Sequence, residues 1–306
     1  MKIGFLFVGQ GSQTVGMGLD VYQNYKSSRD LFDSVSLDFD LKDICFNGPK
    51  EKLDQTYYTQ PSLLVTSLAI SSALKEEGII ADVVAGLSLG EYSALTYAKC
   101  LDVISAIQLV SQRGEIMSNA LPLNMSGMAA VLSDQLDTIK DVIKLVQKEN
   151  IGLLEIANYN SPSQTVISGE NKALEYAIRI LKEHKIRCIP LAVSGAFHTS
   201  LLKNASEELN VVLNQYKFNN PECTVLFNIS GESETEIKSA LTDQICSSVQ
   251  WVKTIKKMRD LGVDCFIEVG PKNSLQKLVK QIIPDAKVFS VDSKESIKQM
   301  IGEIYG

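Results

Sequence analysis

The chain has 306 residues, with 30 Lys and Arg against 36 Asp and Glu, which gives a formal net charge of −6 at pH 7. This slightly acidic balance offers no attraction to nucleic acid or to an anionic membrane surface, so we expect neither as a partner. No segment approaches the roughly 20 apolar residues of a membrane-spanning helix. The six cysteines are scattered, without a Cys-x-x-Cys pair or a Cys/His cluster. This spacing argues against a zinc site and fits free thiols in the reducing cytoplasm.

The N-terminal part of the chain alternates short apolar runs with helical patterns. An apolar strand is predicted over 3–8, and it ends at the glycine-rich turn Gly9-Gln10-Gly11-Ser12-Gln13. Next come predicted helices over 17–33 and 61–77, a strand over 81–85, a helix from 91 and a helix over 102–118. Pro61 suits the first turn of its helix, where the missing N–H costs nothing.

Residues 124–191 have a different rhythm. The pattern predicts a strand over 127–132, a helix over 134–149, strands over 153–158 and 164–168, a helix over 170–183 and a strand over 186–191. This β-α-β-β-α-β order is the ferredoxin-like pattern. We therefore predict a small ferredoxin-like domain over 124–191, inserted into a large domain made of 1–123 and 192–306.

The C-terminal part returns to alternating helices and strands. The predicted elements are helices over 199–213, 235–247, 249–261 and 273–283, strands over 224–229, 264–268 and 287–291, and a final helix from 293. Short apolar strands separated by helices are typical of a parallel sheet covered on both faces. The predicted fold class is α/β, with a large α/β-hydrolase-like domain on a mainly parallel sheet and the inserted ferredoxin-like domain.

The most informative motif is Gly86-Leu87-Ser88-Leu89-Gly90, a Gly-x-Ser-x-Gly pentapeptide between the predicted strand over 81–85 and the helix that starts at Glu91. In such a sharp turn from strand to helix, the serine backbone is strained and its Oγ projects from the sheet. The glycines leave room for neighbouring backbone, and the helix N-terminus favours developing negative charge. These surroundings favour a nucleophilic serine at Ser88 over a plain tight turn.

The chain has two histidines, so a histidine base for Ser88 must be His184 or His198. His184 lies at a polar helix end, which is typical of a solvated histidine. His198 lies in a loop of small residues after an apolar run, where catalytic groups gather in α/β proteins. A histidine that caps a helix is the alternative for His198.

Four motifs follow one another along the chain: Gly9-Gln10-Gly11-Ser12-Gln13, the Ser88 pentapeptide, Gln112-Arg113-Gly114 and Gly195-Ala196-Phe197-His198. As a set they closely resemble malonyl-CoA:acyl carrier protein transacylases and the related acyltransferase domains of fatty-acid and polyketide synthases. The resemblance covers essentially the whole chain. It implies transfer of a malonyl group from malonyl-CoA to the phosphopantetheine thiol of acyl carrier protein, by a ping-pong mechanism through a malonyl-serine, for fatty-acid synthesis. It implies no metal or redox cofactor.

The same resemblance implies roles for single residues. Ser88 is the expected nucleophile, and His198 takes its proton and later activates the acceptor thiol. The backbone N–H groups of Gln10 and Leu89 are expected to hold the oxyanion, where losing one donor typically costs about 3 kcal/mol. Arg113 is expected to pair with the free malonyl carboxylate, because a carboxylate needs a planar two-donor partner.

The resemblance also covers the surroundings of the histidine. Gln250 lies where the family uses a backbone carbonyl to orient the histidine, in place of a triad acid. The acids between Ser88 and His198 fall mostly in or beside the inserted domain, which favours a Ser-His dyad over the Ser, Asp/Glu, His order of ordinary α/β hydrolases. Phe197 is similar to the residue of malonyl-selective relatives, and we expect it to contribute to substrate binding.

Two positions depart from the family pattern. Leu87 stands where many relatives have His, and Val8 stands where they have Pro. Leu87 removes a polar neighbour from the serine, which affects the tuning of Ser88 rather than its identity. It also leaves His198 as the only candidate base.

The alternative function is a related acyltransferase or acyl hydrolase that acts on polyketide carrier proteins, although Arg113 favours a dicarboxylic acyl group. A general serine esterase is disfavoured by Arg113 and by the missing acid. A silent carrier-protein-binding scaffold is disfavoured because all the motifs survive together. We expect a cytoplasmic monomer with malonyl-CoA and acyl carrier protein as partners. Candidate contacts for an acidic carrier protein are Lys253, Lys256 and Lys257.

Overall fold

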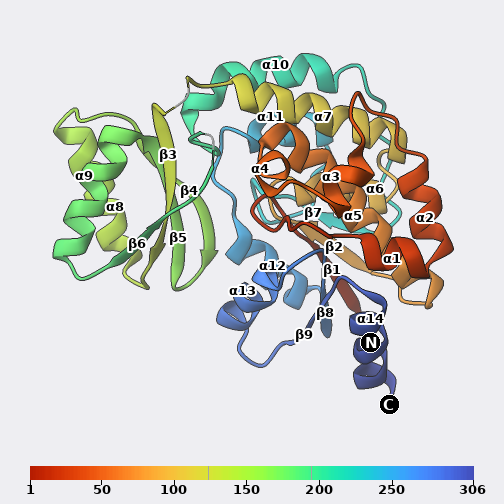
Figure 1. Ribbon diagram of the computed structural model, residues 1–306. Helices are drawn as coiled ribbons and strands as arrows, with labels where there is room; N and C mark the ends of the chain where they lie inside the picture. The colour runs from red at the N-terminus through yellow and green to blue at the C-terminus, as the bar shows by residue number, and fades with distance from the viewer. Residues whose placement is uncertain (123, 194) are drawn as a thin grey trace.

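The computed structural model describes residues 1–122, 124–193 and 195–306. Within these residues it contains a parallel sheet and an antiparallel sheet, which lie side by side in Figure 1. The parallel sheet has the strand order β7-β2-β1-β8-β9. Its strands are β1 (Ile3–Phe7), β2 (Val83–Gly86), β7 (Thr224–Leu226), β8 (Cys265–Val269) and β9 (Lys287–Val291). The prediction of an α/β fold with a mainly parallel sheet is confirmed.

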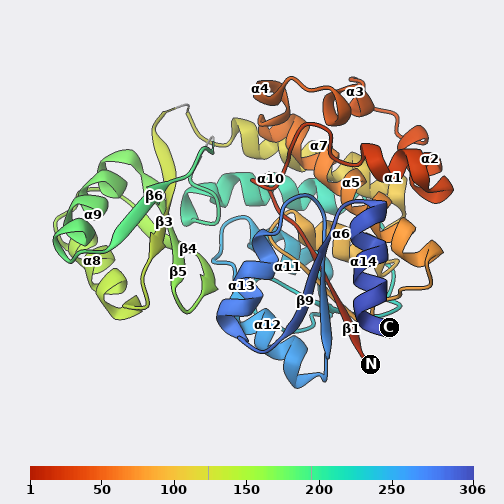
Figure 2. The same cartoon turned by 60° about the horizontal axis from the view of Figure 1, so that its bottom comes forward.

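The central strands of the parallel sheet are buried along their whole length, because helices cover both faces of the sheet. The C-terminal helix α14, for example, packs against the edge strand β9 (Figure 2). The helices of this part are α1 (Leu19–Asn24), α2 (Lys26–Asp33), α3 (Leu41–Phe46), α4 (Lys50–Leu53), α5 (Thr56–Glu76), α6 (Gly90–Tyr97), α7 (Val103–Asn119), α10 (Lys203–Leu213), α11 (Ile237–Gln244), α12 (Trp251–Asp260), α13 (Ser274–Ile282) and α14 (Lys294–Tyr305). In the described part of the chain, no helix is long and apolar enough to cross a membrane.

The helices differ from the prediction in three places. The predicted helix over 17–33 is divided into α1 and α2 at Tyr25, whose backbone is extended. Helix α5 begins at Thr56, so Pro61 lies inside it rather than in its first turn. The proline there removes the hydrogen bond that its N–H would give to the carbonyl four residues earlier. The short helices α3 and α4 were not predicted, because each is too short to show a helical period.

The antiparallel sheet is formed by residues within 124–191. Its strands are β3 (Ser126–Leu132), β4 (Leu154–Ser161), β5 (Gln164–Glu170) and β6 (Arg187–Pro190), in the order β4-β5-β3-β6. Helices α8 (Leu136–Lys148) and α9 (Asn171–Glu183) pack on the face that is turned away from the parallel sheet (Figure 1). The antiparallel sheet and the β-α-β-β-α-β element order agree with the ferredoxin-like expectation. The exact domain boundaries stay a prediction.

The two sheets are joined through the edge strand β4. Val249 lies in the loop before α12 and forms a parallel bridge with Asn158. The Tyr159 N–H donates to Val249 O at 2.9 Å, and the Val249 N–H donates to Ala157 O at 2.8 Å. The loop between α11 and α12 therefore extends the small sheet by one short strand, which fixes this loop relative to both sheets.

The turn after β2 is crowded by the neighbouring strand β1. Gly86 pairs with Phe7 across the parallel ladder, and the Leu87 N–H donates to Phe7 O at 3.0 Å. A Cβ on Gly90 would lie 2.2 Å from Phe7 O, and a Cβ on Gly86 would lie 1.9 Å from the carbonyl carbon of Gly90. Glycine is thus required here by close backbone approach.

Gly90→Ala tests this crowding. Because the new methyl group would overlap β1 backbone, which cannot move freely, we expect the free energy of unfolding to fall by about 3 kcal/mol. The matched control is Gly302→Ala on α14, where a Cβ would meet nothing within 4 Å. That change should raise stability slightly, by up to about 1 kcal/mol, through helix propensity. Urea denaturation measures the free energy of unfolding of both variants. Equal changes in the two would show that the turn after β2 is not crowded.

Candidate functional site

Ser88 occupies the turn between β2 and α6, and its φ is 52°. A serine in this left-handed region costs about 1 to 3 kcal/mol, so surrounding contacts must hold it. Its N–H donates to Asn228 Oδ1 at 2.7 Å, and its C=O accepts from Gln244 Nε2 at 3.0 Å. The strained backbone is therefore held on both sides by residues from distant parts of the chain.

His198 faces Ser88 from the loop after the small sheet. Its Nε2 lies 2.8 Å from Ser88 Oγ, and its Nδ1 lies 2.9 Å from Gln244 O. A carbonyl oxygen can only accept, so Nδ1 carries the proton and Nε2 offers its lone pair to the serine hydroxyl. Burial lowers the pKa of His198 to about 4; the charge of Arg113 acts in the same direction, and the bond to Gln244 opposes them. The ring is thus neutral near pH 7 and able to accept a proton.

The carbonyl beside His198 belongs to Gln244, so the prediction of Gln250 for this position is wrong. The Gln250 carbonyl instead accepts from the Thr254 N–H at 3.0 Å, as the first hydrogen bond of α12. Gln244 is the last residue of α11, and carbonyls at a helix C-terminus have no partner within the helix. The carbonyl that accepts from His198 therefore comes from the end of one helix and not from the start of the next.

Arg113 lies on α7 with 1% of its surface exposed. Its Nη1 donates to Gln60 Oε1 at 2.7 Å, and its Nη2 donates to Gln244 Oε1 at 3.0 Å. Nη2 also lies 3.4 Å from Ser88 Oγ, and Nε has no hydrogen-bond partner in the described part of the chain. Among the described residues, no carboxylate lies within ion-pair distance of this guanidinium. Burial lowers the pKa of Arg113, but an arginine remains charged in proteins.

Buried charges in proteins are normally paired. The partners of Arg113 are instead two neutral amides, a hydroxyl and the ring of Tyr92, whose centroid lies 5.2 Å from the guanidinium carbon. The amides of Gln60 and Gln244, both fully buried, orient the planar group beside the serine. A buried positive charge next to a nucleophilic hydroxyl is suited to a substrate that carries a carboxylate.

Gln10 and Leu89 each carry a backbone N–H near the turn that contains Ser88. Neither N–H donates to an acceptor within the described ranges. The Leu89 N–H shares a planar peptide with the Ser88 C=O and points the opposite way, so the bond from Gln244 to that carbonyl also fixes this N–H. The loop after β1 passes directly over the turn, since a Cβ on Gly9 would lie 2.4 Å from Leu87 O.

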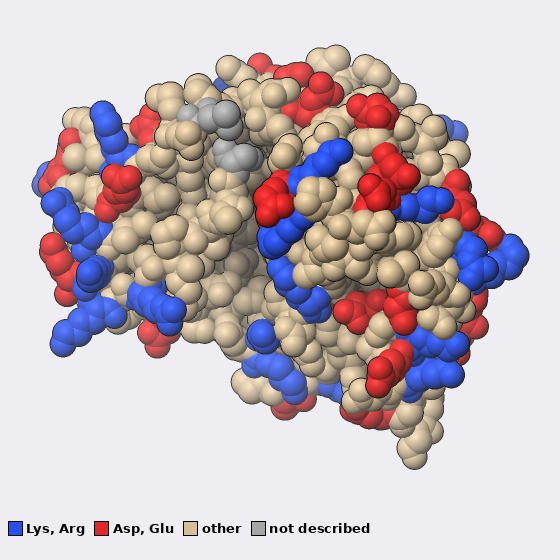
Figure 3. Space-filling view, viewed as in Figure 1, with Lys and Arg blue, Asp and Glu red and all other residues tan. Residues whose placement is uncertain are grey.

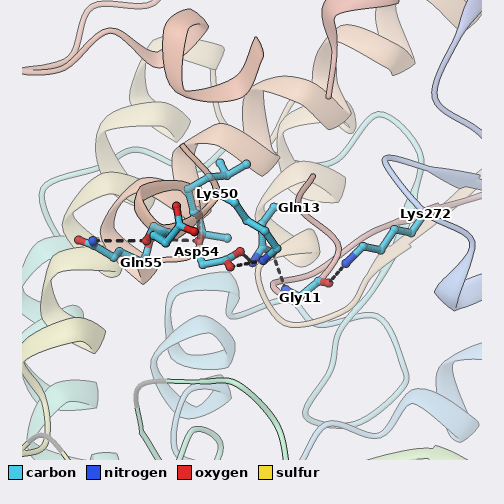
Figure 4. Close-up of polar contacts among 9 residues, drawn as sticks. Gly11, Gln13, Lys50, Asp54, Gln55 and Lys272 are labelled. Carbon is cyan, nitrogen blue, oxygen red and sulfur yellow. Dashed lines mark hydrogen bonds and ion pairs between the residues drawn. The ribbon is translucent and has the colours of Figure 1, made fainter. Parts of the chain in front are cut away.

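The loop that carries Gln10 is held by several polar contacts. The Gln10 side chain donates to Thr56 Oγ1 at 3.0 Å. Figure 4 shows the next residue, Gly11, whose N–H donates to Gln13 Oε1 at 2.7 Å and whose C=O accepts from Lys272 Nζ at 2.6 Å. Gln13 is in turn bound to Asp54. These contacts restrict the direction in which the peptides around Gln10 can point.

The remaining predicted residues lie as follows. Phe197 directly precedes His198 and its ring is buried in the main core; a role in substrate binding stays a prediction. His184 is exposed at the C-terminal end of α9, in the part that carries the small sheet. Leu87 is partly buried against the core. An open groove of about 470 Å³ between α8, β4 and residues 246–248 reaches His198.

Sequence reasoning missed Gln60, Gln244, Asn228 and Glu91, all of them buried polar residues. Three of them, Gln60, Gln244 and Asn228, lie in otherwise helical or apolar stretches without a local motif. Glu91 directly follows the Ser88 pentapeptide, but the sequence does not show its partner. For Gln244 the one signal in the sequence is its place near the end of the predicted helix over 235–247, and that place does not show which residues it contacts. Among the described residues, no cluster of His, Cys, Asp and Glu is suited to hold a metal ion.

Comparison with known proteins agrees with this geometry. The family model described as "Acyl transferase domain" matches residues 4–302. The chain belongs to this acyltransferase family. It is 41% identical over 306 residues to the malonyl CoA-acyl carrier protein transacylase of Bacillus subtilis (strain 168), with 98% of this chain and 96% of that protein covered.

Solved structures of similar proteins have the same fold. The malonyl CoA-acyl carrier protein transacylase of Clostridium perfringens superposes with a TM-score of 0.95 at 38% identity, covering 99% of this chain and 97% of that one. The enzyme called MCAT from Streptococcus pneumoniae has a TM-score of 0.93 at 39% identity, covering 99% and 100%. A malonyl-transacylase solved in complex with a type II PKS acyl-carrier protein has a TM-score of 0.95 at 34% identity, with the same coverage.

The lowered pKa of His198 gives a test by pH. An ordinary histidine with a pKa near 6.5 is mostly charged at pH 5.5, whereas a ring with a pKa of about 4 is still neutral. We expect the rate constant for acylation of Ser88 to stay within about twofold between pH 8 and pH 5.5, and to fall only below about pH 5. Single-turnover quenched-flow measurements give this profile, with circular dichroism as the control for folding. An acid limb centred near pH 6.5 contradicts the assignment of a neutral buried base.

Proposed function

We propose that this chain transfers a malonyl group from malonyl-CoA to the phosphopantetheine thiol of acyl carrier protein, for fatty-acid synthesis. The observation that carries the proposal is the buried Arg113, which lacks a carboxylate partner among the described residues and lies 3.4 Å from Ser88 Oγ. Malonyl-CoA carries a free carboxylate beside its thioester, so the carboxylate can pair with Arg113 while the carbonyl carbon faces the serine. The names of the similar proteins support the same substrate.

The first half-reaction uses the Ser88–His198 pair. His198 Nε2 takes the proton from Ser88 Oγ, and the oxygen attacks the thioester carbonyl. Negative charge develops on the carbonyl oxygen, where the N–H groups of Gln10 and Leu89 are the proposed donors. When the carbon–sulfur bond breaks, the proton on Nε2 passes to the departing thiolate of coenzyme A. Malonyl-Ser88 remains, with its carboxylate on Arg113.

The second half-reaction reverses these steps with a different thiol. The phosphopantetheine thiol of the carrier protein gives its proton to His198 Nε2 and attacks the malonyl ester. The Ser88 oxygen leaves and recovers the proton, so the free enzyme is restored and the mechanism is ping-pong. Each thiol is proposed to enter between the two sheets, where the groove beside α8 reaches His198. All steps use groups of this chain and its substrates, so the mechanism requires no cofactor.

The carrier protein is the proposed macromolecular partner of a monomeric, cytoplasmic enzyme. Figure 3 shows Lys and Arg side chains along one wall of the hollow between the two parts of the molecule, which suits an acidic partner. Lys253 and Lys256 on α12 are exposed. Lys257 forms an ion pair with Glu232 at 2.5 Å, so it is the least available of the three candidates.

Ser88→Ala tests the nucleophile. Without Oγ no acyl-enzyme can form, and we expect transfer of malonyl from malonyl-CoA to holo-acyl carrier protein to fall by about 10⁴-fold or more. Ser93→Ala, at another buried serine in α6, is the matched control and should keep normal transfer. Transfer is followed by gel shift or mass of the carrier protein. Normal transfer by Ser88→Ala would remove the proposed mechanism.

Arg113→Ala tests the carboxylate partner. We expect kcat/KM for malonyl-CoA to fall by about 100-fold or more, because a charge-assisted two-point contact is lost. Transfer of acetyl, which has no carboxylate to bind, should change far less. The control is Arg179→Ala, an exposed arginine that also lies over a tyrosine ring. An equal loss with both acyl donors would leave Arg113 with a purely structural role.

A further inference from the structure

The left-handed backbone of Ser88 is held by a buried pair of residues that the mechanism does not use. Asn228 follows β7 and is 1% exposed. Its Oδ1 accepts from the Ser88 N–H at 2.7 Å, and its Nδ2 donates to Gly86 O at 2.7 Å. One side chain thus bridges the residue at the end of β2 and the serine two positions later.

Glu91 completes this arrangement from the first turn of α6. It is fully buried, and its Oε2 accepts from the Asn228 N–H at 2.5 Å and also from Asn228 Nδ2. Burial raises the pKa of Glu91 to about 8, while the bonds from Asn228 and the charge of Arg113 act in the opposite direction. With this raised pKa the carboxyl group is mainly protonated near pH 7, and its Oε2 still accepts from Asn228. Burying a carboxyl group that has no ion-pair partner among the described residues destabilises a fold, which suggests that this one has a role.

The polarity of these contacts determines how the Asn228 amide is turned. Glu91 Oε2 and Gly86 O both lie against Nδ2, and a backbone carbonyl can only accept. The NH₂ group must therefore face them, which leaves Oδ1 for the Ser88 N–H. If the amide turned over, its oxygen would face Gly86 O and Glu91 Oε2, and two donors would face each other at Ser88. The Glu91 backbone N–H donates to Ser88 O directly at 3.1 Å, whereas the Glu91 side chain reaches Ser88 through Asn228.

We propose that Asn228 and Glu91 are positioning residues that hold Ser88 in its left-handed conformation and so aim Oγ at His198. The inference rests on the proposed role of Ser88 as the nucleophile. Gln244 Nε2 and the Glu91 backbone N–H hold the Ser88 carbonyl, whereas Asn228 holds the N–H on the other side of the same residue. Without the Asn228 contact, the peptide before Ser88 can rotate and φ can relax to the ordinary negative region. The hydroxyl then leaves the line between the thioester carbon and His198 Nε2.

The test uses Asn228→Ser and the isosteric Glu91→Gln. Asn228→Ser removes the acceptor for the Ser88 N–H, and Glu91→Gln replaces the carboxyl group by an amide, whose NH₂ group in the place of Oε2 would face the donating Nδ2 of Asn228. Displacing a reacting group by about 1 Å can cost about 100-fold in rate, so we expect acylation by malonyl-CoA to slow by about 10- to 100-fold. KM should change less than about threefold, because Arg113 is untouched. Labelling by an uncharged fluorophosphonate, which needs Ser88 but not Arg113, should slow in parallel.

Asn228→Asp and the double variant Glu91→Gln/Asn228→Asp examine the coupling. Asn228→Asp alone sets two carboxyl groups against each other, whereas the glutamine of the double variant can donate its NH₂ to the new aspartate. We expect the double variant to acylate several-fold faster than Asn228→Asp alone, a non-additivity that residues in contact show. Additive losses would overturn the inference that Glu91 acts through Asn228.

Glu268→Gln is the matched control for the loss of a buried carboxylate. Glu268 is fully buried on β8, where it accepts from the Leu275 N–H at 3.0 Å and the Gln276 N–H at 2.8 Å at the start of α13. We expect this variant to lower the melting temperature while acylation stays within about twofold of the parent. The two variants are compared by the loss of acylation rate for a given loss of melting temperature. If Asn228→Ser loses no more rate than Glu268→Gln does for the same loss of melting temperature, the positioning role is refuted.

The outcomes separate this inference from the proposed function. If Ser88→Ala still forms an acyl-enzyme or is labelled, the nucleophile assignment has failed. If Ser88→Ala is inactive but Asn228→Ser and Glu91→Gln acylate at the parent rate, the assignment stands and the positioning inference is overturned. Glu91→Gln keeps the volume of the side chain, so it decides the matter should Asn228→Ser not fold.

Discussion

Arg113 carries a buried positive charge that no carboxylate of the described residues meets at ion-pair distance, and the rest of the site is arranged around it. Two buried amides orient its guanidinium, and its charge helps to keep His198 neutral. A charge removed from water without a partner destabilises the protein. We propose that a substrate carboxylate supplies that partner when bound, which would direct the binding energy to one class of acyl group.

Gln244 connects the three proposed functional groups. Its carbonyl accepts from His198, its amide oxygen accepts from Arg113, and its amide NH₂ donates to the Ser88 carbonyl. It can do so because it ends α11, where the backbone carbonyl has no partner within the helix, and because its side chain is buried. The loop that follows is paired with β4 of the small sheet through Val249. The position of His198 therefore depends on how both sheets meet.

Local patterns in the sequence predict the strands, helices and turns that interactions between near neighbours determine. The parallel sheet is predicted by short apolar strands between helices. The turn at Ser88 is predicted by its two glycines, which are needed because neighbouring backbone approaches them closely. The role predicted for Gln250 was wrong because its carbonyl accepts a hydrogen bond within α12, which a motif comparison does not show. Asn228 and Gln244 could not be found from the sequence, since their contacts with Ser88 cross 140 and 156 positions. Such long-range polar contacts leave no periodic signal.

The most direct measurement is the intact mass of the protein after brief exposure to malonyl-CoA, and separately to acetyl-CoA, followed by peptide mapping. We expect one malonyl adduct on Ser88 and little acetyl adduct, because only malonyl brings a carboxylate to Arg113. Equal adducts from both donors would contradict the role of the buried guanidinium. A malonyl adduct on another residue, or release of coenzyme A without any adduct, would contradict the covalent mechanism itself.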